Sequence, residues 1–122
     1  CGDSGRTGHL EFDPNAKFEK DLTAGLHLDI GNSWSASWGD YDNDGWVDLF
    51  IGNESRDDNI SNELYRNNSD GTFTNVANEV GLEIGSFVKG ASWGDYNNDG
   101  RIDLFVSVMG QSNVLYENKF EN

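Results

Sequence analysis

A stretch of fifteen residues occurs twice in this chain. Residues 36–50 read Ala-Ser-Trp-Gly-Asp-Tyr-Asp-Asn-Asp-Gly-Trp-Val-Asp-Leu-Phe, and residues 91–105 repeat them with twelve identities at an offset of 55. The flanks repeat as well, since 62–67 corresponds to 113–118 and the end of the chain copies its residues 17–19. A repeat of this period indicates two copies of one supersecondary unit. We therefore expect an arm at 1–16, a first unit at 17–71 and a second unit at 72–122.

Each unit has the residue pattern of β-structure. Apolar side chains alternate along 46–51 and again along 102–106, as they do in strands. Two short strand-like runs, 64–66 and 72–74, flank a turn that ends in Asp70-Gly71, which predicts a hairpin. Residues 75–82 could form one helical turn that ends at Gly81. The sequence predicts an all-β fold built from these two units.

The repeated stretch contains a loop rich in carboxylates. Both copies follow the spacing Asp-x-Asp/Asn-x-Asp-Gly-x-x-Asp, which places side-chain oxygens at alternate positions of a tightly curled loop. Ca²⁺ takes six to eight such oxygens, and backbone carbonyls contribute to the set. An EF-hand would need a Glu at position 12, where this chain has Ile51 and Val106. We predict two calcium sites, with these ligands: Asp40, Asp42, Asp44, the Trp46 carbonyl and Asp48; and Asp95, Asn97, Asp99, the Arg101 carbonyl and Asp103.

The composition supports this prediction and excludes other classes of protein. The chain carries 8 basic and 22 acidic side chains, a formal charge of −14. It therefore lacks the excess of basic residues that a nucleic-acid-binding face needs. Two Ca²⁺ ions would reduce the charge to −10, because −14 + 4 = −10. No apolar run approaches the roughly 18 residues of a membrane helix. No set of catalytic residues can be assembled outside the loops, so we expect no enzymatic activity.

Residues 17–122 resemble the FG-GAP or VCBS-type repeat. The resemblance rests on the Trp-Gly-Asp-Tyr that precedes each loop, the Asp-Leu-Phe that follows it, and the Asn-x-Leu-Tyr-x-Asn strand. In that family the repeat builds calcium-bearing blades of integrin-like β-propellers and of bacterial surface proteins. The resemblance implies two four-stranded antiparallel propeller-like blades with one Ca²⁺ loop each, and the ligand roles given above. This chain has two such units, whereas the family closes rings of about seven.

Several residues outside the loops are candidates for other roles. Trp38 and Trp93 repeat with the motif, so we expect them to pack between blades. Trp34 and Trp46 do not repeat, and they are candidate contacts for a sugar or another subunit. Sequons for glycosylation begin at three asparagines: Asn53, Asn59 and Asn67.

The leading functional hypothesis is a calcium-stabilised extracellular or cell-surface module, which assembles head to tail as a filament or ring, or mediates adhesion. Two blades cannot close a ring, so their outer faces and edges would be open to a neighbour, and the arm could add a strand there. The alternatives are a carbohydrate-binding module and a fragment of a longer β-propeller surface protein. The chain has one cysteine, Cys1, and its first residue is not Met, so Cys1 could carry a lipid anchor.

Overall fold

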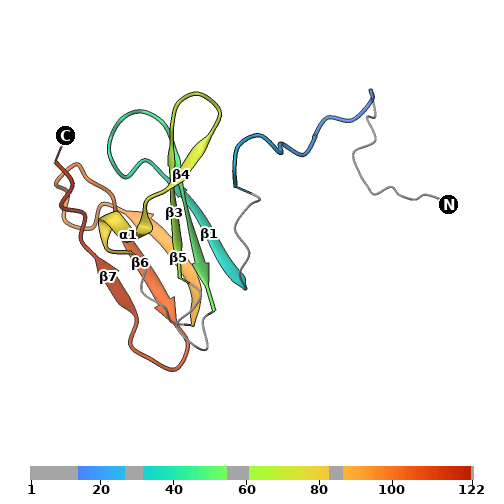
Figure 1. Cartoon of the computed structure of the whole chain (residues 1–122). Helices are drawn as coiled ribbons and strands as arrows, with labels where there is room; N and C mark the ends of the chain where they lie inside the picture. Colours follow the sequence, from blue (N-terminus) through green and yellow to red (C-terminus); the bar gives the residue numbers. More distant parts are fainter. Residues whose placement is uncertain (1–13, 27–31, 55–60, 83–86, 122) are drawn as a thin grey trace.

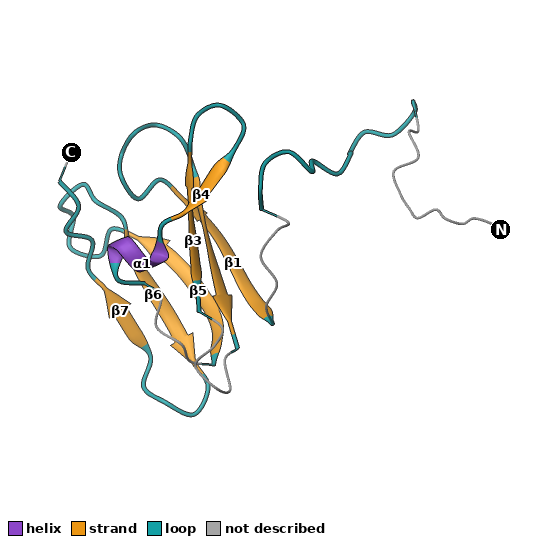
Figure 2. Ribbon diagram, in the orientation of Figure 1, coloured by secondary structure: helices purple, strands orange, loops and turns teal. Residues whose placement is uncertain are grey.

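The computed structural model describes residues 14–26, 32–54, 61–82 and 87–121. These residues form two antiparallel sheets with one helical turn, so the all-β prediction is confirmed (Figures 1 and 2). The first sheet has the strand order β1-β2-β3-β4 and the second has the order β5-β6-β7. The elements are β1 (Ser33–Gly39), β2 (Asp48–Asn53), β3 (Glu63–Asn67), β4 (Phe73–Asn75), α1 (Ala77–Val80), β5 (Val88–Gly94), β6 (Asp103–Val108) and β7 (Val114–Tyr116).

The sequence repeat folds into the same β-hairpin twice. Gly39 pairs with Asp48 at the loop end of the β1–β2 hairpin, and Gly94 pairs with Asp103 at the same place in β5–β6. Both hairpins carry a register irregularity at their far end, between residues 33 and 35 and between residues 88 and 90. The matching register shows that the two copies of the motif specify one local structure.

The strand content of the second sheet differs from the expectation. β4 opens the second unit of the sequence, yet it pairs with β3 and completes the first sheet, so the boundary between the sheets does not fall at 71/72. Among the described residues the second sheet has three strands, and the segment after β7 forms no fourth. The backbone N–H of Phe120 donates to the Asn118 side chain at 2.8 Å, and the Phe120 ring packs edge-on against Tyr41 in the loop between β1 and β2. This turn directs the chain away from the free edge of β7.

The predicted helical turn is confirmed at α1. It ends at Gly81, whose φ of 86° is accessible because glycine lacks a Cβ. The Asn75 side chain accepts the N–H of Ala77 at 3.1 Å, and it also accepts the N–H of Leu64 on β3. Val76 and Ala77 are buried, so the turn closes one end of the core.

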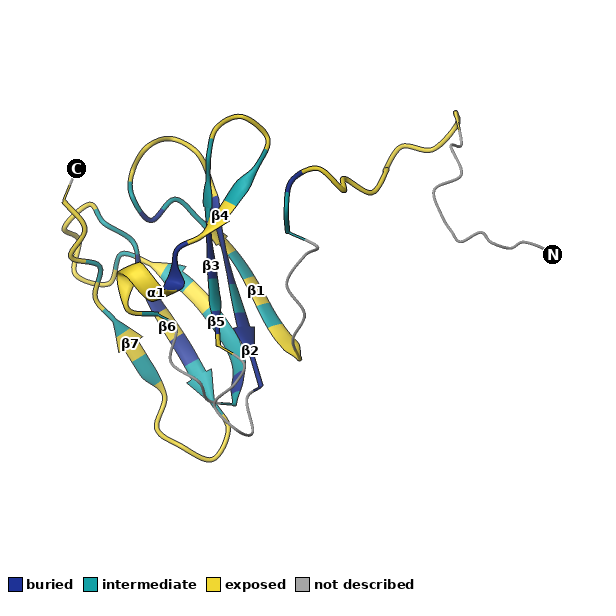
Figure 3. Ribbon diagram, viewed as in Figure 1, coloured by how far each residue is buried: buried dark blue, intermediate teal, exposed yellow. Residues whose placement is uncertain are grey.

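The core lies between the two sheets. Figure 3 shows β2 as a largely buried strand, whereas β3 is buried at Leu64 and Tyr65. The inward side chains of both strands meet those of β5 and β6. Trp93 of β5 lies against Gly39 of β1: a Cβ added to Gly39 would be 2.7 Å from the Trp93 ring. The indole N–H of Trp93 donates to the Ser37 carbonyl at 3.1 Å. The inter-sheet packing expected of Trp93 is therefore confirmed, while Trp38 faces away from the second sheet and is 55% exposed. The buried residues of this core are Tyr41, Phe50, Leu64, Val76, Ala77, Val88, Leu104 and Val106.

A second set of contacts joins the sheets at the end opposite the loops. Glu54 forms an isolated β-bridge with Phe87, and its carboxylate accepts the Lys89 ammonium at 2.8 Å. The same ammonium lies 3.5 Å from the centroid of the Trp34 ring. Trp34 and Lys89 occupy corresponding positions of the two repeats. Because the two residues differ, the cation from the second sheet can contact the aromatic ring from the first.

The described part of the N-terminal region is irregular. Residues 14–26 contain no strand, and Phe18 is 95% exposed. Near its end this segment reaches the first sheet, where the Ala24 carbonyl accepts the N–H of Phe73 at 3.0 Å (Figure 1). Cys1 and the strand donation expected of the arm lie in residues 1–13, outside the described residues.

The contact between Trp93 and Gly39 predicts an asymmetric effect of alanine in the two hairpins. Gly39→Ala should lower the free energy of unfolding by about 1–3 kcal/mol, because the added methyl group collides with the Trp93 ring and with Ile102. Gly94→Ala is the matched control, since a Cβ there meets nothing within 4 Å. Urea unfolding of both variants at low protein concentration measures the difference. Equal destabilisation by the two substitutions would contradict this packing.

Candidate metal centres

The loop between β1 and β2 is curled by hydrogen bonds within its own sequence. The Asp40 carboxylate accepts the backbone N–H groups of Asp44 at 3.2 Å and Gly45 at 2.8 Å. The Asp44 carboxylate then accepts the N–H of Trp46 at 2.9 Å. Asn43 has φ 58° and Gly45 has φ 89°, two left-handed positions that complete the turn. The sequence order of Asp, Asn and Gly thus determines the shape of the loop.

The loop between β5 and β6 has the same hydrogen bonds. Asp95 accepts the N–H groups of Asp99 at 3.1 Å and Gly100 at 2.8 Å, and Asp99 accepts that of Arg101 at 2.9 Å. Asn98 and Gly100 repeat the left-handed geometry, with φ of 59° and 87°. The two copies of the motif therefore build two equivalent loops.

The last carboxylate of each loop is buried and anchors the loop to the sheet. Asp48 is 0% exposed; it accepts the N–H of Tyr41 at 3.2 Å and the N–H of Asn67, the last residue of β3, at 2.8 Å. Asp103 is 1% exposed and accepts the equivalent N–H groups, those of Tyr96 at 3.2 Å and Asn118 at 2.7 Å. Each of these aspartates holds the start of its loop, its own strand and the end of the neighbouring strand together.

The carboxylates of the first loop converge. Oxygens of Asp40, Asp42, Asp44 and Asp48 all lie within 4.8 Å of one another. Oδ1 of Asp42 is buried and has no hydrogen-bond partner among the described residues. Burial raises the pKa of Asp42 to about 7, and a hydrogen bond with Asp40 and the charges of Asp48 and Asp44 add to this rise. Burial likewise raises the pKa of Asp48 to about 6, although the N–H groups of Asn67 and Tyr41 oppose it. A cation bound by oxygen ligands fits this set, because it would partner the orphaned oxygen and offset the crowded negative charge.

The second loop gathers fewer carboxylates and already has a cationic neighbour. Oxygens of Asp95, Asp99 and Asp103 lie within 4.8 Å of one another. The Arg101 guanidinium contacts Asp99 at 3.1 Å, and the side-chain amide of Asn97 donates to Glu117 at 3.1 Å. The backbone N–H of Arg101 and the guanidinium charge hold the pKa of Asp99 below its usual value, despite some desolvation. The second loop is thus less negative than the first.

Two residues support the loops in a role that was not identified from the sequence. Asn67 and Asn118 end the repeated Asn-x-Leu-Tyr-x-Asn strand, and their backbone N–H groups hold Asp48 and Asp103. Their side-chain amides donate to the Val47 and Ile102 carbonyls at 3.0 and 2.9 Å. Their recurrence at the same position of both units was the signal that could have assigned them this role.

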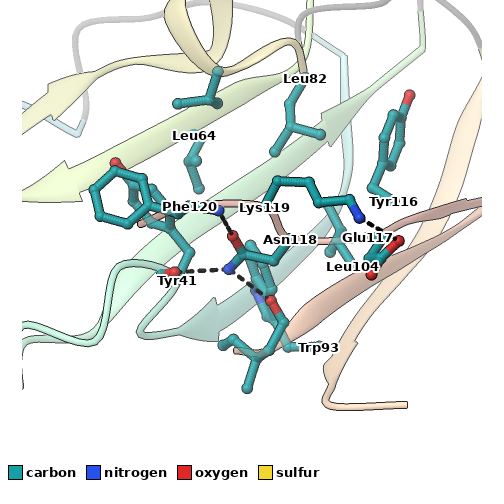
Figure 4. A pocket seen from close by; sticks show the side chains of 12 residues that line it. Tyr41, Leu64, Leu82, Trp93, Leu104, Tyr116, Glu117, Asn118, Lys119 and Phe120 are labelled. Carbon is teal, nitrogen blue, oxygen red and sulfur yellow. Dashed lines mark hydrogen bonds and ion pairs between the residues drawn. The ribbon is translucent and has the colours of Figure 1, made fainter. Parts of the chain in front are cut away.

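Asn118 also lies at the edge of a cavity between the sheets. Its side-chain amide donates to the Tyr41 carbonyl at 2.7 Å, and Figure 4 shows it beside the Glu117–Lys119 ion pair, whose atoms are 3.1 Å apart. The cavity has a volume of about 290 Å³. Its apolar lining comes from both sheets, α1 and the C-terminal segment, and includes Leu64, Val80, Leu82, Trp93, Leu104 and Tyr116.

The other candidate residues do not form a single site. Trp34 is the second residue of β1, at the far end of the hairpin, whereas Trp46 precedes β2 at the loop end, so the two lie at opposite ends of one hairpin. The Lys89 ammonium lies over one face of the Trp34 ring, as described above. The structure therefore provides no shared platform of Trp34 and Trp46 for a sugar ring.

The three sequons lie in different parts of the structure. Asn53 is 1% exposed, and its amide donates to the Ser61 carbonyl at 2.6 Å and to Glu63 at 3.0 Å, so a glycan on Asn53 has no room in the folded chain. The expectation that Asn53 carries a glycan is corrected, because its side chain is buried and hydrogen-bonded to the segment at the start of β3. Asn67 is half-buried, and its amide is engaged by Val47. Asn59 lies outside the described residues.

Comparisons with known proteins address the family of the chain. The search of curated proteins finds no match. In the part of the chain that the structure describes, no helix is long and apolar enough to cross a membrane. The FG-GAP-like repeat matches residues 40–106, from the first ligand position of the first loop to β6 just beyond the second loop. This match spans more than half of the 122 residues and includes both loops, so the chain belongs to the FG-GAP-like repeat family.

Proposed function

We propose that this protein is a non-enzymatic structural module of the cell surface or extracellular space, stabilised by one Ca²⁺ ion in each loop, which assembles head to tail or mediates adhesion. The observation that carries the proposal is the buried, unpartnered Oδ1 of Asp42 within a cluster of four carboxylates. Without a cation, the negative charge of the four clustered carboxylates in the first loop is not balanced by a positive group among the described residues. A bound cation removes that imbalance.

The chemistry of the loops favours Ca²⁺ over Mg²⁺. The proposed ligands are carboxylate, amide and backbone carbonyl oxygens of one short loop, and such a set suits the flexible, high coordination number of Ca²⁺. Mg²⁺ keeps several waters and prefers a rigid octahedron, which does not require four converging carboxylates. In the second loop the oxygen of Asn97 takes the place of one carboxylate.

A location outside the cell agrees with both the family and the ion. FG-GAP-like repeats are typical of extracellular proteins, and such proteins meet millimolar Ca²⁺. At a free Ca²⁺ concentration of 100 times the dissociation constant, each site would contribute about 2.7 kcal/mol to the stability of the folded chain. Binding to two sites is then a large share of the total stability of a small domain.

A structural role is supported by how the charged side chains are used. The acidic clusters found among the described residues are those of the two loops. Glu54 is paired with Lys89, and Glu117 with Lys119, so these carboxylates are engaged in ion pairs. Both sheets also keep aromatic side chains on their outer faces, which is typical of surfaces that pack against another unit.

Removing calcium should destabilise the protein. With excess EDTA the melting temperature should fall by several degrees, because each lost kcal/mol lowers it by roughly 3–6 °C in a domain of this size. Differential scanning calorimetry with EDTA, with Ca²⁺ and with Mg²⁺ measures the effect, and Mg²⁺ should restore little of the loss. A melting temperature that EDTA leaves unchanged would contradict the proposed role of calcium.

Two substitutions in the first loop should separate calcium binding from structural support. Asp42→Ala removes a carboxylate oxygen without a partner, so it should abolish calcium binding at this loop and leave the stability in EDTA unchanged or slightly higher. Asp48→Ala leaves the N–H groups of Tyr41 and Asn67 unpaired, so it should cost about 2 kcal/mol or more even in EDTA. Calcium titrations combined with urea unfolding test both. If the two variants were equally unstable in EDTA, the assigned roles would be wrong.

The first loop should bind calcium more tightly than the second. It has four carboxylates, whereas the second has three and an arginine on Asp99. Calorimetric titration of Asp44→Ala, which leaves only the second site intact, should show weaker binding than Asp99→Ala, which leaves only the first. Asn97→Asp should strengthen the second site. The reverse order of affinities would refute this ranking.

A further inference from the structure

The outer face of the second sheet carries the same side chains as the buried face of the first. Phe105 and Leu115 are 44% and 48% exposed, whereas their counterparts Phe50 and Leu64 are both 1% exposed in the core. Tyr96 is likewise exposed where its counterpart Tyr41 is buried. In the first sheet these side chains pack against the second sheet. In the second sheet the equivalent side chains are exposed on the outer face.

This surface is hollowed at the position where the first sheet receives a tryptophan. Trp93 fills the space over Gly39, while a Cβ added to the corresponding Gly94 meets nothing within 4 Å. A hollow of about 240 Å³ lies at Gly94, and its lining is Ser92, Trp93, Gly94, Asp95, Tyr96, Asp103, Phe105 and Leu115. The hollow is open at this position because Gly94 has no side chain.

The side chain that matches this hollow protrudes from the outer face of the first sheet. Trp38 is the counterpart of Trp93; it lies on the outer face of the first sheet and is 55% exposed. Leu49 and Tyr65 share that face and are already buried, so Trp38 is the large side chain that stands out from it. Its ring contacts Phe73, with centroids 6.1 Å apart, which supports it from one side.

Two hydrogen bonds between the sheets have counterpart residues on the same two faces. Within the chain, Asn118 donates to the Tyr41 carbonyl, and Asn43 donates to the Gly100 carbonyl at 3.0 Å. The corresponding groups on a neighbour would be Asn67 with the Tyr96 carbonyl, and Asn98 with the Gly45 carbonyl. Both of these hydrogen bonds thus have counterpart residues on the two outer faces, whereas the contacts of Lys89 with Glu54 and Trp34 do not, because Trp34 and Lys89 differ between the repeats.

We propose that the hollow over Gly94 is the docking site for Trp38 of a second copy of this chain. The inference rests on the assembly part of the proposed function and specifies its interface. The contact between the two sheets of one chain serves as the template for the contact between chains. Because donor and acceptor lie on different faces, the contact is head to tail, and it leaves one of each free for the next copy.

The test uses the full chain with Ca²⁺ at about 0.15 M salt, where repulsion between the acidic chains is screened. Sedimentation velocity over a concentration series should show self-association of the wild type. Trp38→Ala, which removes the donor, and Gly94→Ala, which blocks the acceptor, should each weaken it by at least about 30-fold, the effect of losing an interfacial anchor residue. Gly94→Ala should melt at the temperature of the monomeric wild type, since its methyl group contacts nothing in its own chain.

Mixing the two variants provides the decisive measurement. A Trp38→Ala chain keeps the hollow and a Gly94→Ala chain keeps the tryptophan, so an equimolar mixture should form a 1:1 dimer and nothing larger. A wild type that stays monomeric at every concentration would overturn the proposal and favour a further blade of a longer chain as the occupant. Variants that assemble as the wild type does would overturn it too.

The same samples separate this inference from the calcium proposal. Melting with and without EDTA reports the loops, whereas the dimer of the mixed variants reports the interface. A monomer stabilised by calcium would contradict the docking site alone. Trp38-dependent assembly without any calcium effect would contradict the calcium sites alone.

Discussion

The buried aspartates at the end of each loop are the constraint on which the structure depends. Asp48 and Asp103 are almost wholly inaccessible, and each accepts two backbone N–H groups from different segments. A carboxylate in such a place is stable only with several donors or a cation beside it. One residue therefore couples the curl of the loop, the pairing of the strands and the proposed affinity for calcium, which explains how so short a motif can specify a whole hairpin.

The two hairpins are joined by residues at which the repeats agree and by residues at which they differ. Gly39 and Trp93 belong to the shared motif and form the close contact at the loop end. Trp34 and Lys89 break the repeat and meet at the far end, beside Glu54. The shared residues also recur on the outer faces, where they leave a glycine hollow and an exposed tryptophan. A packing rule used once inside the chain is thus available for use again between chains.

The sequence sufficed for the features that depend on local chemistry. The Asp-Gly turn of the β3–β4 hairpin, the helical turn that ends at Gly81 and both aspartate loops follow from short-range preferences, and the structure has the hairpin, the turn and the curled loops where they were expected. Features that depend on distant partners were not predictable. The C-terminal segment turns to Tyr41 instead of adding a strand, and Asn53 is a buried hydrogen-bonding residue although its sequon is that of an exposed one. In each case a contact with another segment of the chain overrides the local pattern.

The central claim is that each loop holds one calcium ion in the folded chain. Equilibrium dialysis against buffered Ca²⁺, with the bound metal measured by atomic absorption, tests it most directly because it counts ions per chain. The account predicts a plateau of two ions per chain for the wild type, and of one when either Asp44 or Asp99 is replaced by alanine. A wild-type plateau below one ion per chain at millimolar free Ca²⁺ would contradict it.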